Sequence, residues 1–207
     1  MLNERQKDAL REYMNLFMGQ AASLLSDMVD KRVHLTIPDI QIIDYSEEVN
    51  HLEMIPPSLH SYVVSSSISF GMSFSGEAKL IFPHDKIKTL VNLCLGEDSS
   101  DGIDELTDAD FDAIREIGNI ILNAIVGSIG NLVEVRLDYS LPKVNVLLFP
   151  GDIDQIITKN EVYLLIIRNS FTVEETNIEG AIIVILSMEA ITELIAKIDE
   201  ELVDVYG

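Results

Sequence analysis

The stretch Asp8-Ala-Leu-Arg-Glu-Tyr-Met-Asn15 returns further along the chain as Asp112-Ala-Ile-Arg-Glu-Ile-Gly-Asn119. Both copies keep Asp, Ala, Arg, Glu and Asn in the same places, at an offset of 104 positions. The same offset, without an insertion, aligns Pro38 with Pro142, Gly76 with Gly180, Ile87 with Ile191 and Leu90 with Leu194. At ordinary residue frequencies, a match of Asp, Glu, Asn and Pro at one given offset has a chance of about one in 10⁵. The sequence therefore predicts an internal duplication.

Both copies lie within amphipathic helical patterns. In the first pattern, apolar residues recur at spacings of three and four, which is typical of a helix with one face on a core. These residues are Leu10, Met14, Phe17, Ala21, Leu24 and Met28. The second pattern runs from about Thr107 to Asn131, and either Thr107 or Asp108 could cap it. Its stripe consists of Ile114, Ile121, Ile125 and Leu132.

The two halves continue alike after these helices. Residues before each proline alternate as in a half-buried strand, namely Val33, Leu35 and Ile37 in one half and Leu137, Tyr139 and Leu141 in the other. Two further strands are predicted in each half, at 61–70 and 76–82 and at 162–169 and 180–186. A shorter helix closes each half, near 85–95 and 188–202, and residues 46–60 are predicted to form an irregular loop.

This pattern predicts an α+β fold with pseudo-two-fold symmetry. We expect a β-sheet layer that carries two long motif-bearing helices and two shorter helices. The chain is predicted to be one domain, residues 1–207, built of two repeats at about 1–96 and 105–207. Residues 97–105 are rich in Gly, Ser and Asp and are the expected linker.

Composition narrows the classes of function. A formal charge of −21 predicts repulsion of nucleic acid and of anionic lipid. The N-terminus is charged and lacks an apolar signal region, and the apolar runs fall short of the roughly 20 residues that span a bilayer. The single cysteine, Cys94, can form no disulfide within the chain. We therefore expect a cytoplasmic protein without membrane insertion.

Common catalytic and cofactor motifs are missing from the sequence. The four histidines, His34, His51, His60 and His84, show no metal-ligand spacing, so no metal site is predicted. Neither a phosphate-binding loop nor a dinucleotide fingerprint occurs, and there is no G-x-S-x-G nucleophile elbow.

The candidate functional residues lie on the side of each long helix that faces away from its apolar stripe. On a helical wheel, Glu12 and Asn15 lie about 140–200° from Leu10, so they are predicted to be solvent-facing neighbours one turn apart. Glu116 and Asn119 have the same relation. An exposed Glu beside an Asn is ordinary, but Asn is a mediocre helix former, and its presence in both helices favours a function. Pro38 and Pro142 are predicted to mark a bulge or a sheet edge.

The complete pattern is Asp-x₃-Glu-x₂-Asn-x₂₂-Pro, and it resembles the signature of the CheC/CheX/FliY family of chemotaxis phosphatases. The match covers essentially the whole chain, with Asp8, Glu12, Asn15 and Pro38 in one copy and Asp112, Glu116, Asn119 and Pro142 in the other. Two copies resemble the CheC type, since the CheX type has one and the FliY type adds a domain for which this chain has no room. The first copy departs from the usual form by carrying Tyr13-Met14, which leaves open whether both sites are equally active.

The resemblance implies a substrate, the aspartyl phosphate of the response regulator CheY, and a possible second partner, the receptor deamidase CheD. Hydrolysis needs a water held in line with the breaking bond. A carboxamide can orient this water without adding charge, so Asn15 and Asn119 are assigned to it. Glu12 and Glu116 are assigned to pairing with a cation of the regulator. Asp8 and Asp112 are read as docking or helix-start charges, and any Mg²⁺ is expected on the regulator, with no cofactor on this chain.

Two other functions remain open. The chain could be a non-catalytic binding module that sequesters phosphorylated CheY or CheD. It could also be a structural part of a flagellar switch, but relatives of that kind lack the Glu–Asn pairs, which therefore count against it. The intact pairs favour the phosphatase.

Overall fold

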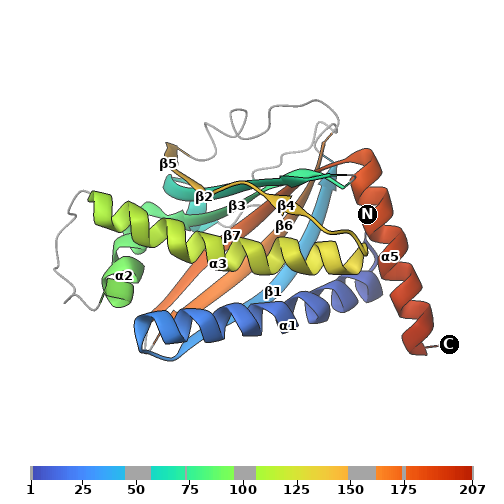
Figure 1. Cartoon of the computed structure of the whole chain (residues 1–207), viewed down its shortest axis with the longest axis horizontal. Helices are drawn as coiled ribbons and strands as arrows, with labels where there is room; N and C mark the ends of the chain where they lie inside the picture. The colour runs from blue at the N-terminus through green and yellow to red at the C-terminus, as the bar shows by residue number, and fades with distance from the viewer. Residues whose placement is uncertain are drawn as a thin grey trace.

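The computed structural model describes residues 2–44, 57–72, 74–95, 106–148, 162–173 and 176–206. Helices α1 (Glu4–Val29) and α3 (Asp108–Leu132) lie side by side on one face of a β-sheet and run in opposite directions (Figure 1). Two shorter helices, α2 (His84–Leu95) and α5 (Met188–Tyr206), lie at opposite ends of this pair. The predicted α+β class, with two long and two shorter helices, is confirmed. The predicted linker and most of the predicted loop at 46–60 lie outside the described residues.

Among the described residues, seven strands form one sheet, and every pairing between them is antiparallel. They are β1 (Val33–Asp44), β2 (Tyr62–Gly71), β3 (Gly76–Pro83), β4 (Asp138–Tyr139), β5 (Lys143–Leu148), β6 (Val162–Val173) and β7 (Thr176–Ser187). The order is β1-β6-β7-β3-β2-β4, and β5 also pairs with β2. The outer strand of each half therefore pairs with a strand of the other half. Strand β1 of the first half pairs with β6 of the second, and β5 of the second half pairs with β2 of the first.

The centre of the sheet has the symmetry expected from the repeat. The offset of 104 carries β2 onto β6 and β3 onto β7, so the strand order reads alike from both ends. Between β3 and β7, Ala78 pairs with Val184 and Leu80 pairs with Ile182, and the offset exchanges these two pairs. The order agrees with a two-fold axis between β3 and β7, while the duplication itself stays a prediction.

The edges of the sheet depart from this symmetry. Val33, Leu35 and Ile37 are buried in β1, as predicted. In the second half, Tyr139 lies in β4 as predicted but is 44% exposed, whereas Leu141 lies outside the strands and is 86% exposed, so the predicted strand is wrong for Leu141. Pro142 separates β4 from β5, and because it has no N–H to donate, the ladder restarts only at the next residue.

The buried stripe of α1 is rotated relative to the prediction. Leu10, Met14 and Ala21 are buried as expected, but Leu24 is 58% and Met28 is 39% exposed, and Phe17 is only half-buried. Met18, Leu25 and Val29 take their places in the core. Two neighbouring rows of apolar residues run along the helix. The row that contains Met18, Leu25 and Val29 is the one that is buried against the sheet. This moves the centre of the core face about 50° toward Asn15.

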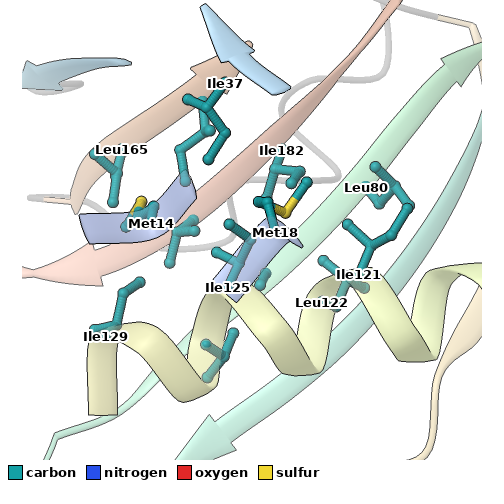
Figure 2. Close-up of a cluster of buried hydrophobic side chains, with 14 of the residues drawn as sticks. Met14, Met18, Ile37, Leu80, Ile121, Leu122, Ile125, Ile129, Leu165 and Ile182 are labelled. Carbon is teal, nitrogen blue, oxygen red and sulfur yellow. The ribbon is translucent and has the colours of Figure 1, made fainter. Parts of the chain in front are cut away.

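The main core fills the space between the two long helices and the sheet (Figure 2). Met14 and Met18 of α1 meet Ile121, Ile125 and neighbouring residues of α3 over the inner strands. A second cluster lies on the opposite face of the sheet and includes Ile43, Leu59, Val63, Ile81, Leu164, Ile166, Ala181 and Ile183. Leu59 belongs to the short helix η2 (Pro57–Leu59), which contacts β3. Apolar residues on both faces explain why β7 reads as a continuous apolar run.

Both long helices begin with a capping box whose third residue reaches another helix. Asn3 caps α1, and Gln6 Nε2 donates to Asp199 Oδ1 on α5 at 2.6 Å. Thr107 caps α3, and Lys88 Nζ on α2 donates to Asp110 Oδ2 at 2.7 Å. Of the two predicted caps, Thr107 is the observed one. These bonds fix the start of each motif helix against a shorter helix.

Helix α3 is long and apolar enough, by length and composition alone, to cross a bilayer. However, 56% of its most apolar 18-residue window is buried inside the fold. Such burial is typical of a helix that packs in the core of a protein.

Candidate functional site

Each motif helix carries its Glu at the surface and its Asn at the border of the core. The side chains of Glu12 and Glu116 are exposed, and neither forms a hydrogen bond or ion pair within the described part of the chain. Asn15 and Asn119 lie one turn further along and are half-buried, not fully solvent-facing as expected. The rotation of the α1 core face explains this for Asn15, which lies about 90° from the centre of that face.

A hydrogen bond ties Asn15 to the edge strand β1. Its Oδ1 accepts the backbone N–H of Ile37 at 2.9 Å. Ile37 lies where the pairing of β1 with β6 shifts register, between Thr36 and Asp39, and Pro38 belongs to the same irregularity. The bulge and edge predicted for Pro38 are confirmed. A bulge frees an N–H from the sheet ladder, and here that N–H points to Asn15. The spacing Asn-x₂₂-Pro thus brings the amide of the helix to the bulge of the strand.

Asn119 is held in a different way. Asn123, one turn further along α3, donates from Nδ2 to Asn119 Oδ1 at 3.0 Å. Leu141, which the offset aligns with Ile37, is 86% exposed. Pro142 is buried and directly precedes β5.

In both copies the carboxamide is anchored through its oxygen. Within the described ranges, no hydrogen bond engages the amide nitrogen of Asn15 or Asn119. Each NH₂ group therefore keeps two donors for a partner, and each oxygen keeps a second lone pair. A side chain fixed in this way loses less freedom when it orients a water or a phosphoryl oxygen.

The residue directly before the motif Asn packs differently in the two copies. A Cβ at Gly118 would overlap the side chain of Ser66 on β2. Close packing thus explains this glycine. Its counterpart on α1 is Met14, which is fully buried. The two copies therefore present their Glu–Asn pairs on helices that approach the sheet differently.

The motif aspartates pair within their own helices. Asp8 Oδ1 accepts from Arg11 Nη2 at 2.6 Å, and Asp112 forms the same contact with Arg115. Both pairs are exposed at a spacing of three residues. Exposed helical pairs of this kind contribute at most about 0.5 kcal/mol. Their main effect is to balance the aspartate charge, so that, among the described residues, Glu12 and Glu116 are the acids of the two motifs without a partner.

A groove of about 1030 Å³ lies beside the first copy. Asp8 and Glu12 line it together with Leu16 of α1 and with Glu201 and Leu202 of α5. Leu16 is 65% exposed. Tyr13 also lines the groove, and burial, together with the charge of Glu201, raises the pKa of its phenol. The first motif therefore borders an apolar groove with an acidic rim.

Other reactive groups are sparse. Within residues 2–44, 57–72, 74–95, 106–148, 162–173 and 176–206, no three His, Cys, Asp or Glu side chains are placed to hold a metal ion. Burial raises the pKa of Cys94 to about 11, against an opposing effect of Lys31, so the thiol is protonated at neutral pH.

Sequence reasoning missed Ile37 and Asn123. The spacing of four between Asn119 and Asn123 on one helix was the available signal for the latter.

No family model matches the chain. It is 23% identical over 146 residues to the flagellar motor switch phosphatase FliY of Bacillus subtilis, covering 70% of this chain and 37% of FliY. It is 22% identical over 160 residues to the CheY-P phosphatase CheC of the same organism, covering 74% of this chain and 72% of CheC. The match therefore spans little more than a third of the length of FliY.

Solved structures share the fold. The crystal structure of Thermotoga maritima FliY has a TM-score of 0.72 at 19% identity, and the match covers 97% of this chain and 98% of that one. FliM in its complex with SpeE from Helicobacter pylori has a TM-score of 0.68 at 13% identity, with 97% of each chain covered. At these identities the structural likeness establishes the fold and no residue's role. The catalytic assignment of Glu12, Asn15, Glu116 and Asn119 stays a prediction.

Proposed function

We propose, from the premise that the chain is a CheC-type member of the CheC/CheX/FliY family, that it hydrolyses the aspartyl phosphate of the chemotaxis response regulator CheY. The observation that carries this proposal is the repeated pairing of an exposed, unpaired Glu with an oxygen-anchored Asn on two surface helices. The names of the relatives, the phosphatases FliY and CheC, support it.

In the proposed reaction, a water attacks the phosphorus of the docked aspartyl phosphate. The new bond joins the water oxygen to phosphorus, the bond between phosphorus and the aspartate oxygen breaks, and inorganic phosphate leaves. Asn15 or Asn119 holds the water in line through its amide group, which adds no negative charge next to the phosphoryl oxygens. The regulator supplies the cation that stabilises the phosphoryl charge, for which we expect Mg²⁺.

Glu12 and Glu116 hold the docked regulator. A carboxylate against the phosphoryl group would repel it, so each Glu instead pairs with a cation of the regulator. Both carboxylates are exposed and lack partners within the described part of the chain, so they are available for this contact. On the first copy, the groove beside Glu12 offers apolar area for the same regulator. This division of labour suits a chain of charge −21, because the regulator brings its own phosphate-binding groups. We place the reaction in the cytoplasm.

The alternative is a binding module that sequesters phosphorylated CheY or CheD without hydrolysis. The likeness to FliM, solved in complexes with SpeE and with FliG, favours this as the second candidate, since the fold serves binding in those proteins. Both functions would use the same helix faces.

The test follows phosphate release from phosphorylated CheY with the wild-type chain, Asn15→Ala, Asn119→Ala and the double variant. We expect the double variant to lose at least about 100-fold in rate while it still binds the regulator. Asn131→Ala is the matched control, because Asn131 is exposed on α3 outside the motif. If the wild-type chain binds the regulator without accelerating phosphate release, the sequestering module is the better account. Loss of binding in the double variant would make the Asn residues docking contacts instead.

A further inference from the structure

The two motif copies anchor their carboxamides with groups that have no counterpart in the other copy. Asn15 uses the backbone N–H of Ile37, and Asn119 uses the side chain of Asn123. The offset aligns Asn123 with Gly19, which has no side chain to offer. It aligns Ile37 with Leu141, which is largely exposed. The anchoring is therefore common to both copies, but the anchoring residue is not.

Stability alone does not explain an Asn at position 123. Its Oδ1 is buried and has no hydrogen-bond partner within the described part of the chain. A buried acceptor without a partner is costly, and Asn is a poor helix former in the middle of a helix. A Leu of similar size would remove both penalties. Among the described residues, the donation to Asn119 is the one hydrogen bond that the side chain of Asn123 forms.

That bond sets the direction of the Asn119 amide. A carboxamide can rotate about its last side-chain bond, so its oxygen and nitrogen can exchange places. Donation from Asn123 Nδ2 holds the oxygen of Asn119 toward α3 and leaves the NH₂ group free. We propose that Asn123 is a positioning residue of the second copy, which turns the NH₂ group of Asn119 toward the docked phosphoryl group and its attacking water. This inference rests on the proposed phosphatase function, and it makes the two copies dependent on different residues.

The test uses Asn123→Leu, which keeps the size of the side chain and removes the donor. In the Asn15→Ala background, where only the second copy works, kcat should fall about tenfold or more with little change in regulator binding. In the Asn119→Ala background, the second copy is already disabled and the same substitution should add no further loss. Equal losses in both backgrounds would reveal a structural effect and overturn the proposal, as would an unchanged kcat in the Asn15→Ala background.

A second readout does not depend on activity. In nuclear magnetic resonance spectra, the side-chain NH₂ signals of Asn119 should shift and broaden in Asn123→Leu, since the amide is no longer held. They should stay in place in Asn131→Leu, a control on the same helix. Unmoved Asn119 signals in Asn123→Leu would overturn the positioning role even if the chain proved to be a phosphatase. A wild-type chain without phosphatase activity would instead contradict the proposed function. The spectra would still test whether Asn123 holds the amide of Asn119.

Discussion

The side-chain oxygen of Asn15 lies 2.9 Å from the backbone nitrogen of Ile37, the residue that precedes Pro38 at the bulge of β1. This bond gives Asn15 a structural role beside its proposed chemical one, and substitutions can separate the two. Asn15→Asp keeps an acceptor for the N–H of Ile37 and loses the NH₂ group. In the Asn119→Ala background we expect near-native unfolding in urea but no phosphatase activity. If the double variant hydrolysed the phosphate as fast as the Asn119→Ala single variant does, the NH₂ group of Asn15 would be dispensable.

The opposite change tests the structural role. Asn15→Leu removes the acceptor and leaves the N–H of Ile37 without its partner. An unsatisfied buried donor costs about 1–3 kcal/mol, so the free energy of unfolding should fall by that amount. Urea denaturation of this variant beside Asn15→Asp measures the difference. Equal stabilities for the two variants would mean that the bond to Ile37 contributes nothing to folding.

The glycines of the two motif helices should respond in opposite ways to the same change. Gly118→Ala places a Cβ against Ser66, so it should destabilise the protein by about 1–3 kcal/mol. A Cβ at Gly19 would have no neighbouring atom within 4 Å, so Gly19→Ala should stabilise α1 by about 0.5–1 kcal/mol. Thermal unfolding of the two variants provides the comparison. A Gly118→Ala variant as stable as the wild type would show that α3 can move away from β2 at little cost.

Acid should weaken the contact between α2 and α3. Burial acts to raise the pKa of Asp110, but hydrogen bonds from Lys88 and Thr107 outweigh it and hold that pKa below its usual value. The contribution of a carboxylate with a lowered folded-state pKa is fully present above the unfolded-state value of about 4. It is lost as the pH falls through the folded-state value.

Asp110→Asn removes this charge at every pH. Because it leaves Lys88 without its partner, we expect it to cost about 3 kcal/mol at pH 7. The cost should shrink as the pH falls below about 4, since the wild type then loses the same interaction. Urea unfolding across this pH range measures both effects. A penalty that is independent of pH would assign the effect to the cap geometry of Asp110 and not to its charge.

Removal of the exposed acids should weaken docking more than chemistry. Glu12→Gln in the Asn119→Ala background removes the charge proposed to pair with a cation of the regulator. We expect KM to rise severalfold, with a smaller change in kcat and a weaker dependence of KM on salt. Asp27→Asn provides the control, since Asp27 is exposed further along α1. A fall in kcat at constant KM would place Glu12 in the chemical step instead.

The sequence predicted those elements whose pattern depends on local spacing. The two long helices, the Thr107 cap and the bulge at Pro38 all follow from helical periodicity, capping chemistry and the missing N–H of proline. The buried row of α1 could not be predicted in the same way. Both rows satisfy helical spacing, and only contact with the sheet decides that Leu25 is buried and Leu24 is exposed.

The candidate site shows the same division. The turn that joins Glu12 to Asn15 is local and was predicted correctly. The bond from Asn15 to Ile37 links residues on different elements, and no spacing rule predicts which backbone N–H a bulge leaves free. The groove beside Glu12 depends on where α5 lies relative to α1, which is a matter of tertiary packing.

The exchange of outer strands between the halves has a consequence during synthesis. Strand β1 pairs with β6 on both sides of its bulge, from Val33 opposite Val173 to Asp44 opposite Tyr163. At about 5–20 residues per second, the ribosome needs roughly 7–28 s to deliver Val173 after Val33. Over that interval β1 is an apolar strand without its neighbour, open to chaperones and to strands of other nascent chains. Slow translation of the second half should therefore lower the yield of native protein more than slow translation of the first.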